Sequence, residues 1–190
     1  FPLYRSKKTK QCIFGAIGDI QVGDSIELAY AARSLFSELA VQSSVDFHLI
    51  LGDLVNDDTR LFPAMGHLIR SLPVPSWTLP GNHDRNIQNL DQPLDHFHTH
   101  FGASDYAFHH GSAFFMVFNN VSSTVKYGYE GRFNADQLEF IKNCLKNIPK
   151  DQLVILSQHI PMVNTKNRDE VLELLHNYER VLILSGHTHQ

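Results

Sequence analysis

Five short apolar runs are spaced along this chain, and they restrict its fold more than any other feature. Each run is rich in Ile, Leu, Val or aromatic residues, as expected for a strand that is buried on both faces. Helical patterns separate most of the runs, and alternating strands and helices predict a mostly parallel sheet. The runs are residues 12–17, 47–51, 74–79, 153–156 and 181–184.

Capping signals mark the helices between these runs. Asp24 with Glu27, and Asn134 with Gln137, have the form of capping boxes, and apolar residues follow each at helical spacing. The stretch from Asn167 repeats this pattern. A further helix is expected over residues 61–72, where a proline near the first turn is tolerated.

The middle of the chain predicts a second sheet. Residues 106–108 and 113–118 flank His110 and Gly111 and have the pattern of an antiparallel hairpin. With helices on the outside, the sequence predicts an α/β fold. Its mixed, mostly parallel β-sheets form a four-layer α/β/β/α sandwich.

Length and composition are those of one domain over residues 1–190. The chain has 190 residues, of which 43% are hydrophobic, and no run is long enough to span a membrane. The net charge of −4 does not indicate a basic surface for binding nucleic acid. The chain lacks a starting Met and stops one residue after His189, so we expect a fragment of a longer protein, truncated at the carboxyl end. Cys12 and Cys144 fit buried thiols and indicate no disulfide.

A polar cluster follows each apolar run. The carboxyl ends of parallel strands meet at one edge of a sheet, so all of these clusters are expected to converge there. Their carboxylate, carboxamide and imidazole groups are metal-ligand chemistry. The clusters are residues 18–21, 52–56, 81–84, 158–159 and 186–189.

Two carboxylates, Asp19 and Asp53, would repel each other at this edge without a cation. Two divalent ions remove the repulsion, and Asp53 is the best candidate to bridge them. Mixed oxygen and nitrogen ligands suit Mn, Fe or Zn, and paired ions in hydrolytic sites share a hydroxide nucleophile and clamp phosphoryl oxygens. His83 is then free to protonate a leaving group, with Asp84 as its orienting partner.

This ordered set resembles the calcineurin-like metallophosphoesterase superfamily, whose pattern is D-x-H, GDxx[DN], GNH[DE], H and GHxH. The resemblance covers essentially the whole chain. It implies a binuclear metal centre, a metal-bound hydroxide nucleophile and hydrolysis of a phosphoester by a phosphatase, phosphodiesterase or pyrophosphatase. It also implies His83 and Asp84 as catalytic residues. One metal would take Asp19, Asp53 and His189, and the other Asp53, Asn82, His159 and His187.

One ligand departs from the pattern, because Gln21 stands where the superfamily usually has His. An amide oxygen is a weaker donor to a transition metal than imidazole, so we expect Gln21 to coordinate the first metal weakly or to hold its water. Alternation with Asp19 would put both side chains on the same side of the strand end. Branches that are similar in having Gln here include diphosphatases acting on nucleoside diphosphate derivatives and a bacterial extracytoplasmic group. The second of these favours a periplasmic location by resemblance only.

The alternative to an enzyme is a non-catalytic metal-binding scaffold of the same fold. Such scaffolds typically lose the catalytic histidine, which this chain keeps as His83. The expected partner is a phosphorylated substrate contacted by Asn82, His83 and Arg85, although the position of Arg85 after Asp84 favours a surface-loop role slightly over this contact. The sequence identifies no protein partner. His96, His98 and His100 are open to a structural role, substrate contact or a third metal.

Overall fold

Two β-sheets form the centre of the protein. The structure, a computed structural model, describes residues 11–42 and 44–189. The first sheet is parallel, with the order β1 (Phe14–Ile17), β2 (Phe47–Ile50) and β3 (Ser76–Thr78). The second has the order β4 (Tyr106–His110), β5 (Ala113–Val117), β8 (Leu153–Ser157) and β9 (Val181–Leu184). Only β4 is antiparallel to its neighbour in that sheet, so the expected hairpin is confirmed. A small antiparallel hairpin pairs β6 (Val121–Ser123) with β7 (Tyr129–Gly131).

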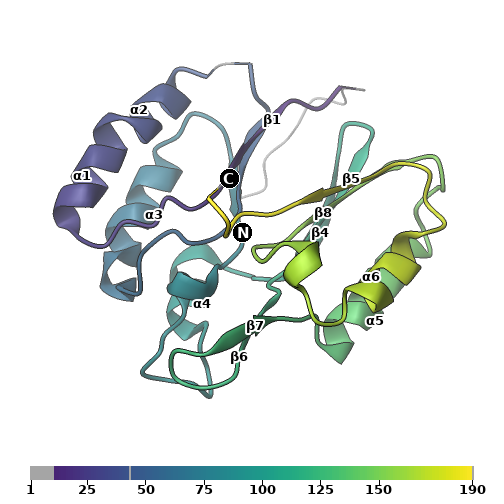
Figure 1. Cartoon of the computed structure of the whole chain (residues 1–190). Coiled ribbons are helices and arrows are strands. Elements are labelled where there is room, and N and C mark those ends of the chain that lie inside the picture. The colour runs from purple at the N-terminus through teal and green to yellow at the C-terminus, as the bar shows by residue number, and fades with distance from the viewer. Residues whose placement is uncertain (1–10, 43, 190) are drawn as a thin grey trace.

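Helices cover the outer faces of the two sheets, one group on each side (Figure 1). The first group contains α1 (Ser25–Arg33), α2 (Leu35–Ala40), α3 (Phe62–Arg70) and α4 (Asp95–Phe101). The second contains α5 (Ala135–Leu145) and α6 (Arg168–Leu175). Short 3-10 turns span Thr59–Leu61, Asn82–Asp84 and Met162–Asn164.

Three apolar layers hold this arrangement together. Ile50 packs with Phe36, Phe62 and Met65 between the first sheet and its helices. Phe114, Met116 and Leu156 pack with Ile141 and Val171 between the second sheet and α5 and α6. The alternate residues of β2 and β5, such as Leu49 and Phe115, fill the layer between the sheets. The four-layer α/β/β/α sandwich expected from the sequence is therefore confirmed.

Local details differ from the sequence expectations at two points. Strand β1 begins at Phe14, so Cys12 precedes the strand and is only partly buried. Asn167 caps no backbone amide of α6 with its side chain; it exchanges hydrogen bonds with the backbone N–H and C=O of Phe133 at 3.1 and 3.0 Å. The capping box at Asn134 is present, with Gln137 closing it. Within residues 11–42 and 44–189, no helix has the length and apolarity needed to cross a bilayer.

Candidate metal centre and active site

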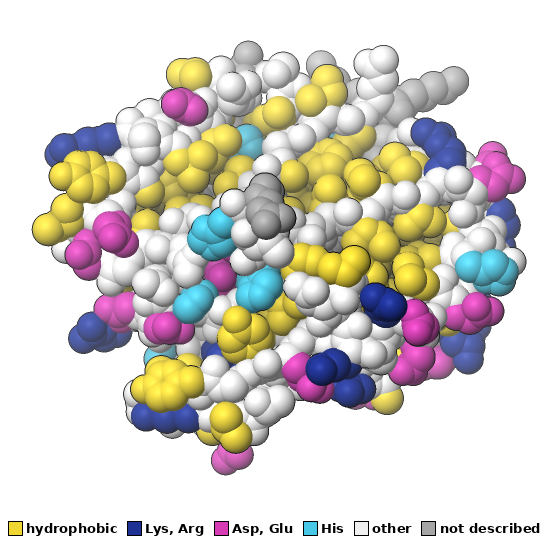
Figure 2. All heavy atoms as spheres, in the orientation of Figure 1, with side chains coloured by type: hydrophobic (Ala, Val, Ile, Leu, Met, Phe, Trp, Pro, Cys, Tyr) yellow, Lys and Arg dark blue, Asp and Glu magenta, His cyan; other side chains and the backbone are white. Residues whose placement is uncertain are grey.

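The loops that follow β1, β2, β3, β8 and β9 bring their polar residues to one edge of the two sheets. On this face, Figure 2 shows histidine side chains gathered around a carboxylate, with hydrophobic side chains beside them. The edge is formed by strand ends, as open sheets of this kind require. The five sequence clusters therefore meet in space, although they are far apart along the chain.

Asp53 lies at the centre of this edge. It directly follows β2, has a left-handed backbone (φ 51°) and is 2% exposed. Its Oδ1 accepts a hydrogen bond from the backbone N–H of His83 at 2.9 Å. A Cβ atom on Gly81 would lie 2.0 Å from the same oxygen, so only glycine at that position lets the carboxylate occupy its place. The backbone thus holds the Asp53 carboxylate in a buried position.

His159 faces Asp53 with one nitrogen already engaged. Its Nδ1–H donates to the carbonyl oxygen of Leu51 at 2.8 Å, which fixes the tautomer of the neutral ring. Its Nε2 then lies 3.2 Å from Asp53 Oδ2 and 3.0 Å from Asn82 Oδ1. In the neutral ring all three atoms carry lone pairs and none carries a hydrogen, so a proton or a cation has to lie among them.

A transition-metal ion fits this set of donors. Donor atoms of Asp53, His159 and His187 lie within 4.8 Å of one another. Burial lowers the pKa of His187, and the neighbouring His159 lowers it further, which keeps the ring neutral and able to coordinate. For His159, burial lowers the pKa, but the hydrogen bond and charge of Asp53 outweigh it and raise the pKa above 6.5. A proton therefore competes with a metal for this nitrogen.

Asp19 lies in a more open part of the edge. Both of its carboxylate oxygens accept from the backbone N–H of His187 at 2.9 Å, and His189 Nε2 lies 3.6 Å from Asp19 Oδ1. The His189 side chain is 56% exposed. Gly186 packs so close that a Cβ atom there would lie 2.7 Å from Asp19 Oδ2. This half of the edge is assembled from the first and last described strands.

Gln21 reaches this edge through its backbone. Its N–H donates to the carbonyl oxygen of Asp53 at 2.7 Å. Strand β1 ends at Ile17, and Asp19 and Gln21 have left-handed backbones (φ 55° and 48°). The strand alternation that placed their side chains together does not apply here, because it requires extended backbone. The role of Gln21 as a weak ligand stays a prediction.

His83 has a different acidic neighbour from the one expected. Its Nδ1 lies 3.0 Å from Oδ1 of Asp57, which follows the second sequence cluster directly. The carboxylate of Asp84 is fully buried and accepts from the backbone N–H groups of Gly81, Leu54 and Val55. Burial and the charge of Asp53 raise the pKa of Asp84 to about 7. Asp57 is therefore the group that orients the His83 ring, whereas Asp84 ties together the loops after β2 and β3.

Arg85 is buried and does not lie on a surface loop. The residue is only 4% exposed. Its guanidinium donates hydrogen bonds to Asn82 O, Ser123 Oγ and Gly128 O at 2.8 to 3.1 Å. Its guanidinium lies over the ring of Tyr129, 5.2 Å from the centroid. Arg85 therefore anchors the β6–β7 hairpin beside the metal edge. Its predicted contact with substrate is untested by this geometry.

Tyr129 is a site residue that the sequence analysis missed. Its ring meets that of His187 edge to face, with the centroids 5.9 Å apart, and the residue is 39% exposed. It is held on the β6–β7 hairpin, far along the chain from any of the five clusters. No periodicity or motif marks it, because its position depends on the tertiary contact with Arg85.

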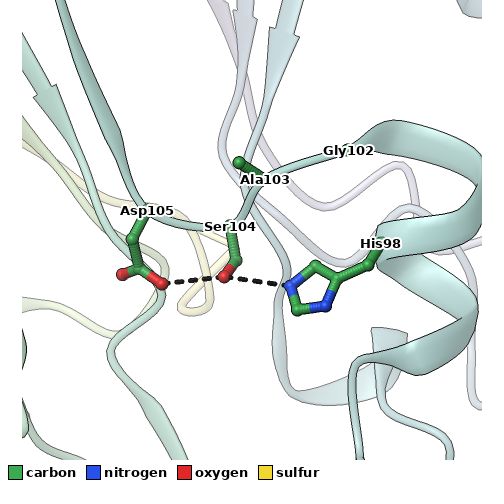
Figure 3. A pocket seen from close by; sticks show the side chains of 5 residues that line it. All are labelled: His98, Gly102, Ala103, Ser104 and Asp105. Atoms are coloured by element: carbon green, nitrogen blue, oxygen red, sulfur yellow. Dashed lines mark hydrogen bonds between the residues drawn. The ribbon is translucent and has the colours of Figure 1, made fainter.

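His96 and His98 of α4 have protein partners other than the predicted metal ligands. His96 Nδ1 contacts Thr59 Oγ1 at 2.7 Å. His98 lines a shallow pocket with Ser104 and Asp105, shown in Figure 3. Ser104 Oγ donates to Asp105 at 2.7 Å, so His98 Nε2, 3.2 Å from Oγ, has to donate to the serine. A nucleophilic serine needs the opposite direction, with histidine accepting the hydroxyl proton. His98 therefore does not activate Ser104 as a nucleophile.

Comparisons with known proteins identify the family of this chain. The sequence profile of the calcineurin-like phosphoesterase family matches residues 14–190, and the chain belongs to that family. It is 29% identical over 161 residues to a 3',5'-cyclic-nucleotide phosphodiesterase of a Nostoc species, a match covering 79% of this chain and 58% of that protein. It is 24% identical over 160 residues to a probable glycerophosphodiester phosphodiesterase of Arcobacter nitrofigilis, covering 76% of this chain and 57% of that one. The chain thus spans less than three-fifths of the length of these curated relatives.

A solved structure shares the fold. The phosphopantetheinyl hydrolase of Mycobacterium tuberculosis superposes with a TM-score of 0.56 at 10% identity, covering 95% of this chain and 84% of that one. At this level of identity the likeness concerns the architecture alone.

Proposed function

We propose that this domain hydrolyses phosphoesters, phosphodiesters first among them, with a binuclear metal centre at the carboxyl edge of its sheets. The observation that carries the proposal is that Asp53 Oδ2 and Asn82 Oδ1 both lie within 3.2 Å of His159 Nε2. The backbone of the neighbouring His83 is hydrogen-bonded to the same Asp53 carboxylate. The names of both curated relatives support phosphodiesters as the first substrates to test.

The ligands would divide into a buried and an open position that share Asp53. Asn82, His159 and His187 complete the buried position. Asp19 and His189, with Gln21 as a weak donor, complete the open one. Mn, Fe or Zn suits this mixture of carboxylate, amide and imidazole groups. Such ions supply Lewis acidity toward a phosphoryl oxygen and make a nearby water more acidic.

His83 is assigned the proton transfer. Its Nδ1 is engaged by Asp57 at 3.0 Å, which orients the ring and leaves Nε2 for the substrate. As a water oxygen bonds to phosphorus and releases a proton to solvent, the bond from phosphorus to the leaving oxygen breaks, and that oxygen takes a proton from His83. The backbone N–H of His83, bonded to Asp53 at 2.9 Å, fixes this histidine relative to the ligands.

The proposal is tested by a hydrolysis panel on the full natural chain, with the metal content of the same sample measured. The panel contains a generic diester, a monoester, a pyrophosphate, a 3',5'-cyclic nucleotide and a glycerophosphodiester. We expect diester hydrolysis that chelation abolishes and Mn or Zn restores. A fully metal-loaded sample that hydrolyses none of them, yet captures a protein through the metal edge, would replace the enzyme with the scaffold alternative.

A further inference from the structure

A second group of donor side chains lies at the opposite end of the sheets. Cys12 precedes β1, Asp46 precedes β2, and His110 ends β4. Cys12 and Asp46 therefore lie at the amino ends of the parallel strands β1 and β2. His110 lies at the amino end of β5, because β4 runs antiparallel to β5. The four residues of β1 span roughly 13 Å, so this group is well separated from the carboxyl edge where Asp19 lies.

Hydrogen bonds and close packing hold the three residues beside one another. Asp46 N–H donates to the carbonyl oxygen of Ile13 at 2.7 Å, and Ile13 N–H donates to Asp46 Oδ2 at 3.0 Å. Gly111 turns with a φ of 57°, and a Cβ atom there would lie 3.3 Å from Cys12 Cβ. The hairpin turn after His110 therefore lies directly against Cys12, at a contact that a larger residue would disturb.

The donor atoms have the spacing of a metal site. His110 Nε2 lies 3.3 Å from Asp46 Oδ2, and one donor atom each of Cys12, Asp46 and His110 lie within 4.8 Å of one another. Ligand atoms about 2.1 Å from a tetrahedral zinc are ~3.4 Å apart. Among the described residues, the buried Nε2 atom has no partner with hydrogen-bond geometry. The Phe47 ring, 5.1 Å away between centroids, packs edge to face against the imidazole.

We propose that Cys12, Asp46 and His110 bind one zinc-like transition-metal ion, separate from the catalytic centre. A thiolate, an imidazole and a carboxylate together suit Zn²⁺ or Co²⁺, whereas Ca²⁺ and Mg²⁺ prefer all-oxygen shells. Cys12 and Asp46 enter the first sheet, and His110 belongs to the second. The ion would therefore join the two sheets at their amino ends.

Cobalt substitution tests this inference directly. The carboxyl edge offers only oxygen and nitrogen ligands, and the sequence has two cysteines, Cys12 and Cys144. A near-ultraviolet thiolate-to-cobalt charge-transfer band would therefore report on this site and not on the catalytic centre. Titrating the full metal-free chain with Co²⁺, we expect this band to saturate at one thiolate-bound ion per chain. Zn²⁺ should then displace it.

Matched variants assign the band. Cys144→Ser should keep it, Cys12→Ser should abolish it, and His110→Gln should weaken Co²⁺ binding by roughly tenfold or more. Alkylation tests the same inference without a variant. In the unaltered protein, bound Zn²⁺ should slow the alkylation of Cys12, which mass spectrometry follows at that residue. Absence of the band in the unaltered chain, its persistence in Cys12→Ser, or alkylation unaffected by Zn²⁺ would each overturn the inference.

Discussion

The buried and open halves of the metal edge differ in the exposure of their side chains and in the contacts that hold them. The side chains of Asp53 and His159 are 2% and 0% exposed, and each has a second hydrogen-bond partner that fixes its orientation. Asp19 and His189 are 10% and 56% exposed, and their contact is longer, at 3.6 Å. Preorganised, water-excluded ligands bind a metal more tightly than mobile ones. The difference predicts a buried position that fills first and an open position that exchanges its ion.

The largest effect should come from the residue that both halves share. Asp53→Asn removes the carboxylate placed between the two positions and leaves His159 Nε2 beside a neutral amide. We expect both metals to be lost from the purified protein and turnover to fall by more than about three orders of magnitude, since metal-ion catalysis supplies several kcal/mol. Metal analysis and diester hydrolysis measure this, with the exposed Asp91→Asn as control. With the separate ion proposed for Cys12, Asp46 and His110 removed by working in Cys12→Ser, a variant that keeps one full equivalent of metal would show that Asp53 is not shared.

The next effect separates proton transfer from metal binding. His83→Ala should reduce turnover by about two to four orders of magnitude while the metal content stays near normal. Asp57→Asn keeps the ring but weakens its orienting contact, so a loss of roughly 10- to 100-fold is expected. Steady-state kinetics at a fixed metal concentration checks both. Unchanged turnover in His83→Ala on every substrate would remove this residue from the mechanism.

Metal affinity at the buried position should depend on pH. Because Asp53 raises the pKa of His159, the protonated pair stabilises the metal-free fold below pH 6.5, and this stability is lost as pH rises through the raised pKa. A metal needs the deprotonated nitrogen, so affinity at the buried position should increase about tenfold per pH unit up to that pKa and then level off. Competitive metal titration across pH measures it. A flat profile would mean that His159 is not a ligand.

The smallest effect should come from the open half. Gln21→His offers imidazole in place of an amide oxygen and should tighten Zn²⁺ or Mn²⁺ binding at that position. Gln21→Ala should weaken it, while the buried position stays filled. We expect changes of roughly tenfold or less, because the position is exposed. Identical stoichiometry and affinity in all three proteins would place Gln21 outside the coordination shell.

The sequence predicted the architecture and the meeting of the five clusters, because buried strands and their order along the chain are local signals. It did not predict Asp57 as the neighbour of His83. Asp84 is adjacent in sequence, but its carboxylate turns inward to three backbone N–H groups. Nor did it predict the burial of Arg85 or the place of Tyr129, which depend on a hairpin docked against a distant loop. Contacts of this kind are set by tertiary packing and have no local pattern.

The bond between the His187 backbone and the Asp19 carboxylate joins groups 168 residues apart. At the usual 5–20 residues per second of protein synthesis, this interval corresponds to roughly 8 to 34 s. For most of that time Asp19 and Asp53 have been made, but His187 and His189 have not. The complete set of ligands therefore arises only when the last described strand pairs with β8. Metal uptake would then be a late event in the maturation of the chain, and a loaded centre would mark a molecule whose two sheets have already come together.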